Sequence, residues 1–405
     1  MHTLWDDRFA GRTDNIGSSA IRELLKLTSL PDVISFAGGL PAPELFPIER
    51  FKEAAEVVLT EMGDRALQYG TTEGYQPLRE MIAKNAGKYG IQISADNVLI
   101  TTGSQQALDL LGRIFINRGD RILVESPTYL GAIQAWNAYG VKYVTIPFDD
   151  DGMQTDLLEE RLRTGLKFIY VLPNFQNPTG VTLSRERRMQ LVEMANAYGV
   201  PIVEDDPYGQ LRYEGDHIPP VVVLDDEIRA KEVPIYSGNV IYTSTFSKIL
   251  APGLRLAWVV APTAVIRKLV QAKQGCDLNT STFNQYLAYE VANGPWMKTH
   301  IQRIRVTYKE RRDVMIKALE DYMPEGVRWT RPKGGLFLWV TLPESINSAD
   351  IFPVAVKEKV AFVPGNSFHP LGGGENTMRL NFSCMKPELI VEGIKRLAGV
   401  VKKNL

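Results

Sequence analysis

The residues around Lys248 are of the kinds that surround a chemically reactive lysine. It follows a hydrophobic run at 240–242 and lies among small hydroxyl residues, with an arginine shortly after it. A lysine at the end of a buried strand is costly to place unless its amine does chemistry, and the commonest such chemistry is a Schiff base with a carbonyl group. Thr245, Ser247 and Arg255 are able to hold a phosphate beside it. Because most lysines near strand ends are simply solvated, this segment indicates a cofactor site only with support from the rest of the chain.

The elements that must position this lysine belong to an α/β fold. Short β-branched runs alternate with helical stretches through the middle of the chain, which predicts a mostly parallel sheet. The expected strands are 98–102, 121–125, 168–172, 201–204, 240–244 and 256–260. One helix is expected to start at Gly103, and another to run from Ser184 to Gly199, since serine caps a helix start and glycine ends a helix.

The character of the sequence changes after about Gly294, where a smaller α+β domain is indicated. The expected elements there are a long charged helix at 296–322, strands at 335–340 and 378–382, and a helix at 348–359. A short amphipathic helix at 18–27 is expected near the N-terminus. We therefore predict an arm that also forms part of the small domain (1–45), a large domain (46–293) and a small C-terminal domain (294–405).

Length, charge and composition exclude several classes of protein. A chain of 405 residues can bury a large core, and its formal net charge of −1 leaves no electrostatic footprint for nucleic acid or an anionic membrane. No apolar stretch approaches the ~20 residues of a membrane span, and the N-terminus lacks the pattern of a signal peptide, so we expect a cytoplasmic protein. The 2 cysteines and 4 histidines are scattered, which predicts neither a disulfide framework nor a metal site.

Chemically unusual residues follow several of the predicted strands, at the edge where ligands bind in open α/β sheets. Ser104 and Gln105 open a helix whose free N–H groups suit a phosphate, although a glycine turn with a capping serine would look the same. Tyr129 is placed either to stack on a flat cofactor ring or to cover the sheet edge. Asn177 lies in an Asn-Pro turn that needs no specific amide, so its side chain is spare to bond a ligand oxygen.

Two adjacent carboxylates, Asp205 and Asp206, follow the strand at 201–204. They are unfavourable at the end of a buried strand unless one has a cationic partner, and solvated turn acids are the alternative. A protonated pyridine nitrogen would serve as that partner, and Tyr208 could reach the phenolic oxygen of the same ring. The order of these segments along the chain favours pyridoxal phosphate (PLP) as the carbonyl partner of Lys248.

This set of residues and its order resemble the fold type I PLP enzymes, specifically the class I/II aminotransferases, over nearly the whole chain. The most similar branch is that of the 2-aminoadipate (LysN-like) and kynurenine/aminoadipate aminotransferases. The segments that carry the resemblance are 19–25, 35–41, 68–75, 204–208 and 244–248. The resemblance implies an α/β large domain with a mostly parallel seven-stranded sheet, a smaller α+β domain, and a homodimer with shared active sites.

The resemblance also implies a role for each site residue. Lys248 would carry PLP as a Schiff base and act as the proton-transfer base, with Asp205 on the ring nitrogen and Tyr208 on the ring oxygen. The remaining cofactor contacts would be Ser104, Gln105, Tyr129, Asn177, Thr245, Ser247, Arg255 and, from the partner subunit, Tyr69. The substrate contacts would be Arg379 on the α-carboxylate, Arg22 on a side-chain carboxylate, Gly39 and Asn177. No metal is implied.

An aminotransferase of this branch moves an amino group between an L-amino acid and 2-oxoglutarate by a ping-pong mechanism, in amino acid metabolism such as lysine biosynthesis. The implied donors are 2-aminoadipate and glutamate, with aromatic or leucine-like amino acids as further candidates. A PLP lyase or synthase of the same fold would keep the cofactor contacts and change only the substrate contacts. A PLP-binding regulator would add a DNA-binding domain; the resemblance begins by about residue 15 and the charge is balanced, which disfavours that interpretation.

Overall fold

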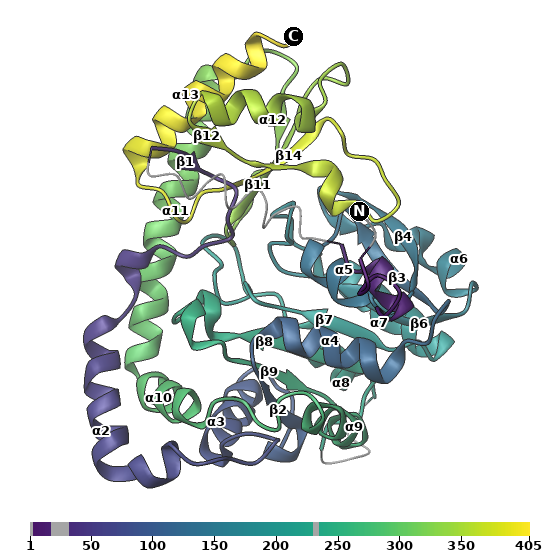
Figure 1. The fold of residues 1–405 in the computed structure, drawn as a ribbon, viewed down its shortest axis with the longest axis vertical. Helices are drawn as coiled ribbons and strands as arrows, with labels where there is room; N and C mark the ends of the chain where they lie inside the picture. Colours follow the sequence, from purple (N-terminus) through teal and green to yellow (C-terminus); the bar gives the residue numbers. More distant parts are fainter. Residues whose placement is uncertain (1–2, 18–31, 230–234) are drawn as a thin grey trace.

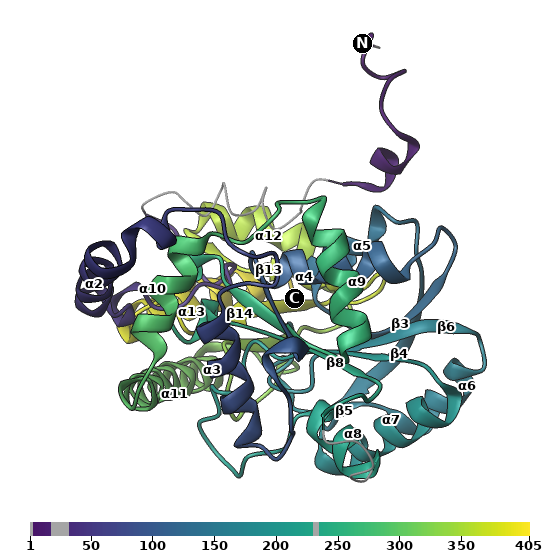
Figure 2. The ribbon, with the colours of Figure 1, turned by 90° about the horizontal axis from the view of Figure 1, so that it is seen from below.

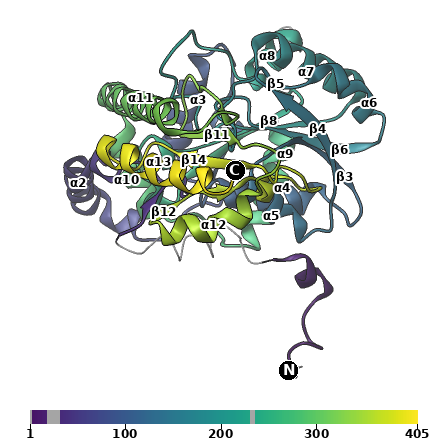
Figure 3. The ribbon, with the colours of Figure 1, turned by 90° about the horizontal axis from the view of Figure 1, so that it is seen from above.

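A computed structural model describes residues 3–17, 32–229 and 235–405. Figure 1 shows a large sheet with helices around it, a smaller sheet above it, and the long helix α11 (Trp296–Tyr322) along one side. The helix predicted at 18–27, and Arg22 within it, lie outside the described residues. The N-terminal end of the segment 3–17 extends away from the body of the molecule (Figures 2 and 3), whereas residues 15–17 lie near it. In the described part of the chain, no helix combines the length and the apolar character needed to cross a membrane.

The large sheet has the strand order β2-β9-β8-β7-β6-β3-β4-β5. Its strands are β2 (Val98–Thr101), β3 (Arg121–Ser126), β4 (Lys142–Asp149), β5 (Gly152–Met153), β6 (Leu166–Val171), β7 (Ile202–Asp205), β8 (Val240–Thr245) and β9 (Ala257–Val260). Strands β8, β7, β6, β3 and β4 are parallel, whereas β9 is antiparallel to both of its neighbours. The described residues thus form an eight-stranded sheet, one more than the expected seven, because the two-residue β5 pairs antiparallel with β4.

All six strands expected from the sequence are present, but β4 was not among them. Most of its residues are only partly buried, and Pro147 interrupts its apolar pattern. A proline cannot donate to a strand ladder and is typical of sheet edges, and β4 lies beside the edge strand β5. The sequence signal of β4 is weak for these reasons.

Both faces of the large sheet are buried under helices. On one face lie α4 (Ser104–Phe115), α5 (Leu130–Asn137) and α9 (Thr263–Gln274), and on the other lie α6 (Leu158–Leu162), α7 (Arg185–Tyr198) and α8 (Val221–Arg229), as Figure 2 shows. The side chains of β6 alternate accordingly: Phe168 and Tyr170 face α4 and α5, whereas Ile169 and Val171 face α7 and α8. Strands buried on both faces read as continuous hydrophobic runs, which is why the sequence predicted them.

The helix predicted between Ser184 and Gly199 is α7. The Ser184 side chain accepts a hydrogen bond from the Arg187 N–H, and Gly199 ends the helix with a φ of 63°, in the left-handed region that favours glycine. Two local capping signals therefore determine where this helix begins and ends. Three further helices pack in sequence outward from β2: α3 (Gln76–Gly87) contacts β2, α10 (Thr282–Ala292) contacts α3, and α2 (Ile48–Ala66) contacts α10.

The C-terminal part forms an antiparallel sheet in the order β10-β11-β14-β13. Its elements are β10 (Arg328–Trp329), β11 (Phe337–Thr341), α12 (Ser348–Lys357), β13 (Val363–Pro364), β14 (Thr377–Asn381) and α13 (Pro387–Lys402). A separate pair joins β1 (Ile34–Ser35) to β12 (Val360–Ala361) in parallel, so the start of the chain packs on its end. Figure 3 shows α12 and α13 on the outside of this part. The division at 45 and 293 stays a prediction.

Arg188 ties α7 to the turn that follows β6. The side chain is fully buried and donates to four oxygens. Three are the backbone carbonyls of Leu183, Pro219 and Pro173, at 2.8–3.0 Å, and the fourth is Asn174 Oδ1, at 2.7 Å. Burial lowers the pKa of Arg188 to about 10. Arg188 therefore links α7 to both ends of the turn at 173–183, which contains Asn177.

We expect Arg188→Met to lower the free energy of unfolding by about 3 kcal/mol, because several buried oxygens lose their donor. Urea unfolding measures this change. Arg185→Met on the same helix is the control: its side chain is 53% exposed and lies 3.7 Å from Glu227, so its effect should stay within about 0.5 kcal/mol. Equal losses for the two variants would contradict the role assigned to Arg188.

Candidate active site

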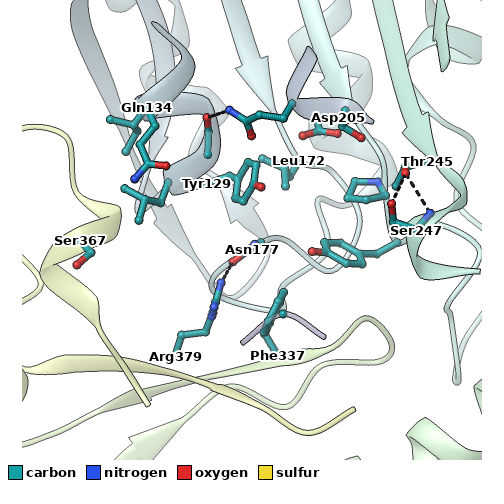
Figure 4. A pocket seen from close by; sticks show the side chains of 18 of the residues that line it. Tyr129, Gln134, Leu172, Asn177, Asp205, Thr245, Ser247, Phe337, Ser367 and Arg379 are labelled. Atoms are coloured by element: carbon teal, nitrogen blue, oxygen red, sulfur yellow. Dashed lines mark hydrogen bonds between the residues drawn. The ribbon is translucent and has the colours of Figure 1, made fainter. Parts of the chain in front are cut away.

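A cavity of about 1030 Å³ lies at the carboxyl ends of the parallel strands, between the large and the small sheet (Figure 4). Of the predicted site residues that the structure describes, all except Tyr69 line it. They are Gly39, Ser104, Gln105, Tyr129, Asn177, Asp205, Tyr208, Thr245, Ser247, Lys248, Arg255 and Arg379. Side chains from five strand ends and from the small sheet therefore meet in one place.

One end of the cavity is built to receive an anion. Gly103 precedes α4 with a φ of 78°, and a Cβ there would lie 2.5 Å from the Arg255 guanidinium, so only glycine lets this arginine approach the helix start. The Thr245 hydroxyl accepts a hydrogen bond from the Ser247 N–H at 3.1 Å, which fixes the turn before Lys248. Arg255 forms no ion pair with a carboxylate in the described part of the chain. Helix N–H groups, hydroxyls and one cation together suit a phosphate.

Asp205 ends β7 and is 2% exposed. Its Oδ2 accepts a hydrogen bond from the Tyr170 hydroxyl at 2.9 Å, whereas its Oδ1 has no hydrogen-bond partner among the described residues. Burial raises the pKa of this carboxyl to about 7; the bond from Tyr170 opposes the rise, and Asp206 adds to it. A buried carboxylate with one free oxygen calls for a cationic donor from a ligand.

Lys248 points into the same cavity. Its Nζ donates to the Gly39 carbonyl at 2.9 Å. Burial, together with the positive charges of Arg379 and Arg255, lowers the pKa of Lys248 to about 8. A lysine in such surroundings has a larger neutral fraction near physiological pH than an ordinary lysine, and the neutral amine is the nucleophile.

Arg379 lies in β14, at the side of the cavity formed by the small sheet. It is 3% exposed and donates to Asn177 Oδ1 at 2.7 Å and to the Ala37 carbonyl at 2.6 Å. Its guanidinium lies 4.3 Å from the Phe337 ring centroid, and its Nε is buried without a partner among the described residues. Burial lowers the pKa of Arg379 to about 10. A buried guanidinium that bonds only neutral oxygens is suited to a carboxylate from a ligand.

Two aromatic rings line the space between these charges. Figure 4 shows Tyr129 beside Leu172, with Asp205 on one side and Gln134 on the other. Tyr208 packs edge-on against Phe337, with ring centroids 5.9 Å apart. Burial raises the pKa of both tyrosines, so both hydroxyls stay protonated and act as donors.

Tyr69 does not reach this cavity within its own chain. It is 79% exposed and lines a second cavity of about 480 Å³ with residues such as Asp277 and Phe283. Its predicted contact with a phosphate depends on a partner subunit and stays a prediction. The contact predicted for Arg22 falls outside the described residues.

The sequence analysis missed several residues of the site. Phe337 lies under Arg379, Tyr170 bonds Asp205, and Gln134 and Ser367 line the end of the cavity away from Asp205 (Figure 4). The sequence carries no signal for Tyr170, because the register of β6 against β7 is what places Tyr170 and Asp205 on the same side of the sheet. Within the ranges that the structure covers, no group of three or more His, Cys, Asp or Glu side chains is placed to hold a metal ion.

Comparisons with known proteins agree with this geometry. The sequence profile of the family Aminotransferase class I and II matches residues 31–397. Aromatic-amino-acid aminotransferase 1 of Thermococcus litoralis is 48% identical over 99% of this chain and 95% of its own length. The 2-aminoadipate transaminase of Thermus thermophilus is 45% identical over 98% and 97%. The structure of LysN, the alpha-aminoadipate aminotransferase of Thermus thermophilus, complexed with N-(5'-phosphopyridoxyl)-L-leucine, superposes with a TM-score of 0.92 at 43% identity and covers 99% of each chain.

The residues of the cavity fit PLP, which carries a phosphate, a protonatable ring nitrogen, a ring oxygen and an aldehyde. The unpartnered Oδ1 of Asp205 suits the ring nitrogen, and the amine of Lys248 suits the aldehyde. The Arg255 guanidinium, which lies against Gly103 at the start of α4, suits the phosphate. The ring nitrogen, the phosphate and the aldehyde therefore each have a matching side chain. The chain belongs to the class I and II aminotransferases and is a PLP-dependent transaminase.

Proposed function

We propose that this transaminase passes the amino group of an L-amino acid to 2-oxoglutarate, as a cytoplasmic homodimer with shared active sites. The observation that carries the proposal is the buried Arg379, which faces the cavity with no carboxylate partner in the described chain. Amino acids and 2-oxo acids share an α-carboxylate, so one guanidinium serves both halves of a ping-pong cycle.

The donor range follows from the part of the cavity that is left for a substrate side chain. Neutral residues line this part: Asn15, Ile16, Leu130, Ile133, Gln134, Asn137 and Ser367. Apolar and aromatic side chains can lie against such a wall, and amides can bond polar ones. We propose donors ranging from 2-aminoadipate and glutamate to aromatic and leucine-like amino acids, with Arg22 as the contact for a side-chain carboxylate.

The relatives support this breadth, because their names mention aromatic amino acids and 2-aminoadipate, and one structure holds a leucine conjugate. The 2-aminoadipate transaminase also suggests a place in lysine biosynthesis. The proposal is thus a broad-specificity enzyme rather than one tuned to a single donor.

The chain's own residues divide the chemistry among them. When bound, PLP supplies an aldehyde that takes up the amino group and a ring that accepts electrons from the α-carbon. Lys248 holds the cofactor and then, as a neutral amine, takes the α-proton. Asp205 keeps the ring nitrogen protonated, and Asn177 and Tyr208 bond the ring oxygen. Arg379 orients the substrate so that its α-proton faces Lys248.

Further residues hold the cofactor in place. We propose that Tyr129 stacks on the ring, and that Gly39 contacts the substrate. The phosphate contacts would be Ser104, Gln105, Thr245, Ser247, Arg255 and, from the partner subunit, Tyr69. All of these residues line the cavity except Tyr69, which lies in the second cavity of its own chain.

Absorption spectra test the function directly. A yellow protein–PLP band should fade with glutamate, 2-aminoadipate or an aromatic amino acid and return with 2-oxoglutarate, and the extent of fading ranks the donors. Lys248→Ala should show neither change, since turnover should fall by about 10⁴-fold or more without its proton-transfer base. Release of ammonia instead of a second amino acid would favour a lyase. A wild-type protein that never binds PLP would contradict the proposal.

Arg379→Met should lower kcat/KM for every amino acid donor by about 10²-fold or more, because a buried charge pair with the α-carboxylate is lost. The PLP absorption band should persist, since the proposed role of Arg379 is in substrate binding. Arg379→Lys keeps the charge but not the two-pronged geometry, and should recover only part of the loss. Steady-state kinetics and spectra of the variants measure both effects. Unchanged kinetics with a lost PLP band would contradict this assignment.

The reactivity of Lys248 should rise with pH. Its lowered pKa of about 8 leaves about a tenth of the amine neutral at pH 7, and this fraction grows as the pH passes 8. The rate at which the cofactor-free protein captures PLP should therefore increase between pH 6 and 9 and then level off. Stopped-flow absorption measures this rate. A rate that keeps rising to pH 10 would indicate an unshifted lysine.

A further inference from the structure

Tyr170 brings a hydroxyl into a largely apolar layer of the large domain. It is fully buried on β6, on the face covered by α4 and α5. Its ring packs edge-on against Trp136, with centroids 5.0 Å apart, and Trp136 is itself fixed by a hydrogen bond to the Leu108 carbonyl at 2.9 Å. A buried hydroxyl costs free energy unless it is hydrogen-bonded, so its partner is informative.

That partner is the Asp205 carboxylate. The hydroxyl donates to Oδ2 at 2.9 Å. Parallel pairing of β6 and β7 sets Tyr170 against Val203, two residues before Asp205 and on the same face of the sheet. The other oxygen, Oδ1, is buried without a partner among the described residues, and Asp205 lines the cavity whereas Tyr170 does not. Tyr170 thus fixes one carboxylate oxygen from the side away from the cavity, and the other oxygen is left for a ligand.

We propose that Tyr170 is a positioning residue for the cofactor: it fixes the Asp205 carboxylate and keeps it ionised, so that Oδ1 meets the protonated ring nitrogen of PLP. Because Tyr170 does not line the cavity, it acts through Asp205 alone. This inference rests on the proposed role of Asp205.

The charges around Asp205 agree with this role. Burial and the neighbouring Asp206 both raise the pKa of the Asp205 carboxyl, and the bond from Tyr170 lowers it, with a result of about 7. Tyr129 and Tyr208 also face Asp205, but burial raises their own pKa values and keeps them neutral. Loss of the Tyr170 hydroxyl should therefore raise the pKa of Asp205, so that the carboxylate forms only at higher pH.

Cofactor affinity tests this inference without relying on turnover. The PLP dissociation constant of the full chain is measured by equilibrium dialysis from pH 6 to 9. Tyr170→Phe should weaken PLP binding about tenfold at pH 7 and less at pH 9, because a hydrogen bond to a charged group is lost. Tyr236→Phe is the matched control. Tyr236 is also buried and donates to a buried carboxylate, Asp225 Oδ2, at 2.9 Å, but Asp225, unlike Asp205, does not line the cavity. It should leave PLP affinity unchanged.

A double-mutant cycle separates positioning from packing. If Tyr170 acts through Asp205, then Tyr170→Phe should cause little further loss of PLP affinity in an Asp205→Asn background. Equal losses in both backgrounds, or an unchanged affinity in Tyr170→Phe alone, would overturn the inference.

If the Tyr170→Phe chain does not fold, a second substitution tests the same inference. Replacement of Tyr170 by 3-fluorotyrosine keeps the ring and makes the hydroxyl a stronger donor, so PLP should bind more tightly; weaker or equal binding would also overturn the inference. Failure of the proposed function looks different, because the wild-type chain itself would then not bind PLP or exchange amino groups.

Discussion

Charges without a charged partner in the protein determine the design of this enzyme. Lys248, Asp205 and Arg379 face one cavity, and none forms an ion pair with another side chain in the ranges that the structure covers. An unpaired charge in such a place is destabilising unless a ligand complements it. The partners proposed for these groups are the aldehyde and ring nitrogen of the cofactor and the α-carboxylate of the substrate, so groups that destabilise the free chain are the ones proposed to bind ligands.

The architecture brings these charges together through two sheets. Parallel strands present their carboxyl ends at one edge, which places the turns that follow β3, β6, β7 and β8 beside one another. The antiparallel sheet contributes Arg379 and Phe337 from the adjacent strands β14 and β11. The hydrogen bond between Arg379 and Asn177 connects the two parts of the molecule at the site itself.

What the sequence could predict depended on how local each signal was. Strand-end residues such as Asn177, Asp205 and Lys248 stand beside turn signals in the sequence, and the structure places all three in the cavity. The contact of Phe337 with Arg379 could not be read in the same way, because it depends on how two strands pair and on where the small sheet packs. The bond between Tyr170 and Asp205 needs the register of β6 against β7, which a single sequence does not specify.

Other parts of the fold and of the site depend on information that one sequence does not carry. The half-buried β4 has too weak a pattern, and the short β5 is held only by its pairing with β4. The exposed Tyr69 lies in a second cavity, and its role depends on another copy of the chain, about which one chain's packing gives no information.

The two ends of the cavity come from different structural elements, and this division has a consequence for protein engineering. The charged end is built from strand ends and from β14, all of them anchored in sheets, whereas the neutral end is built from α5, the segment 15–17 and η7 (Gly365–Phe368). Substitutions in libraries directed at Ile133, Gln134, Asn137 and Ser367 therefore alter a wall to which no cofactor contact is assigned. Selectivity should be open to directed evolution by steps that each preserve a functional enzyme.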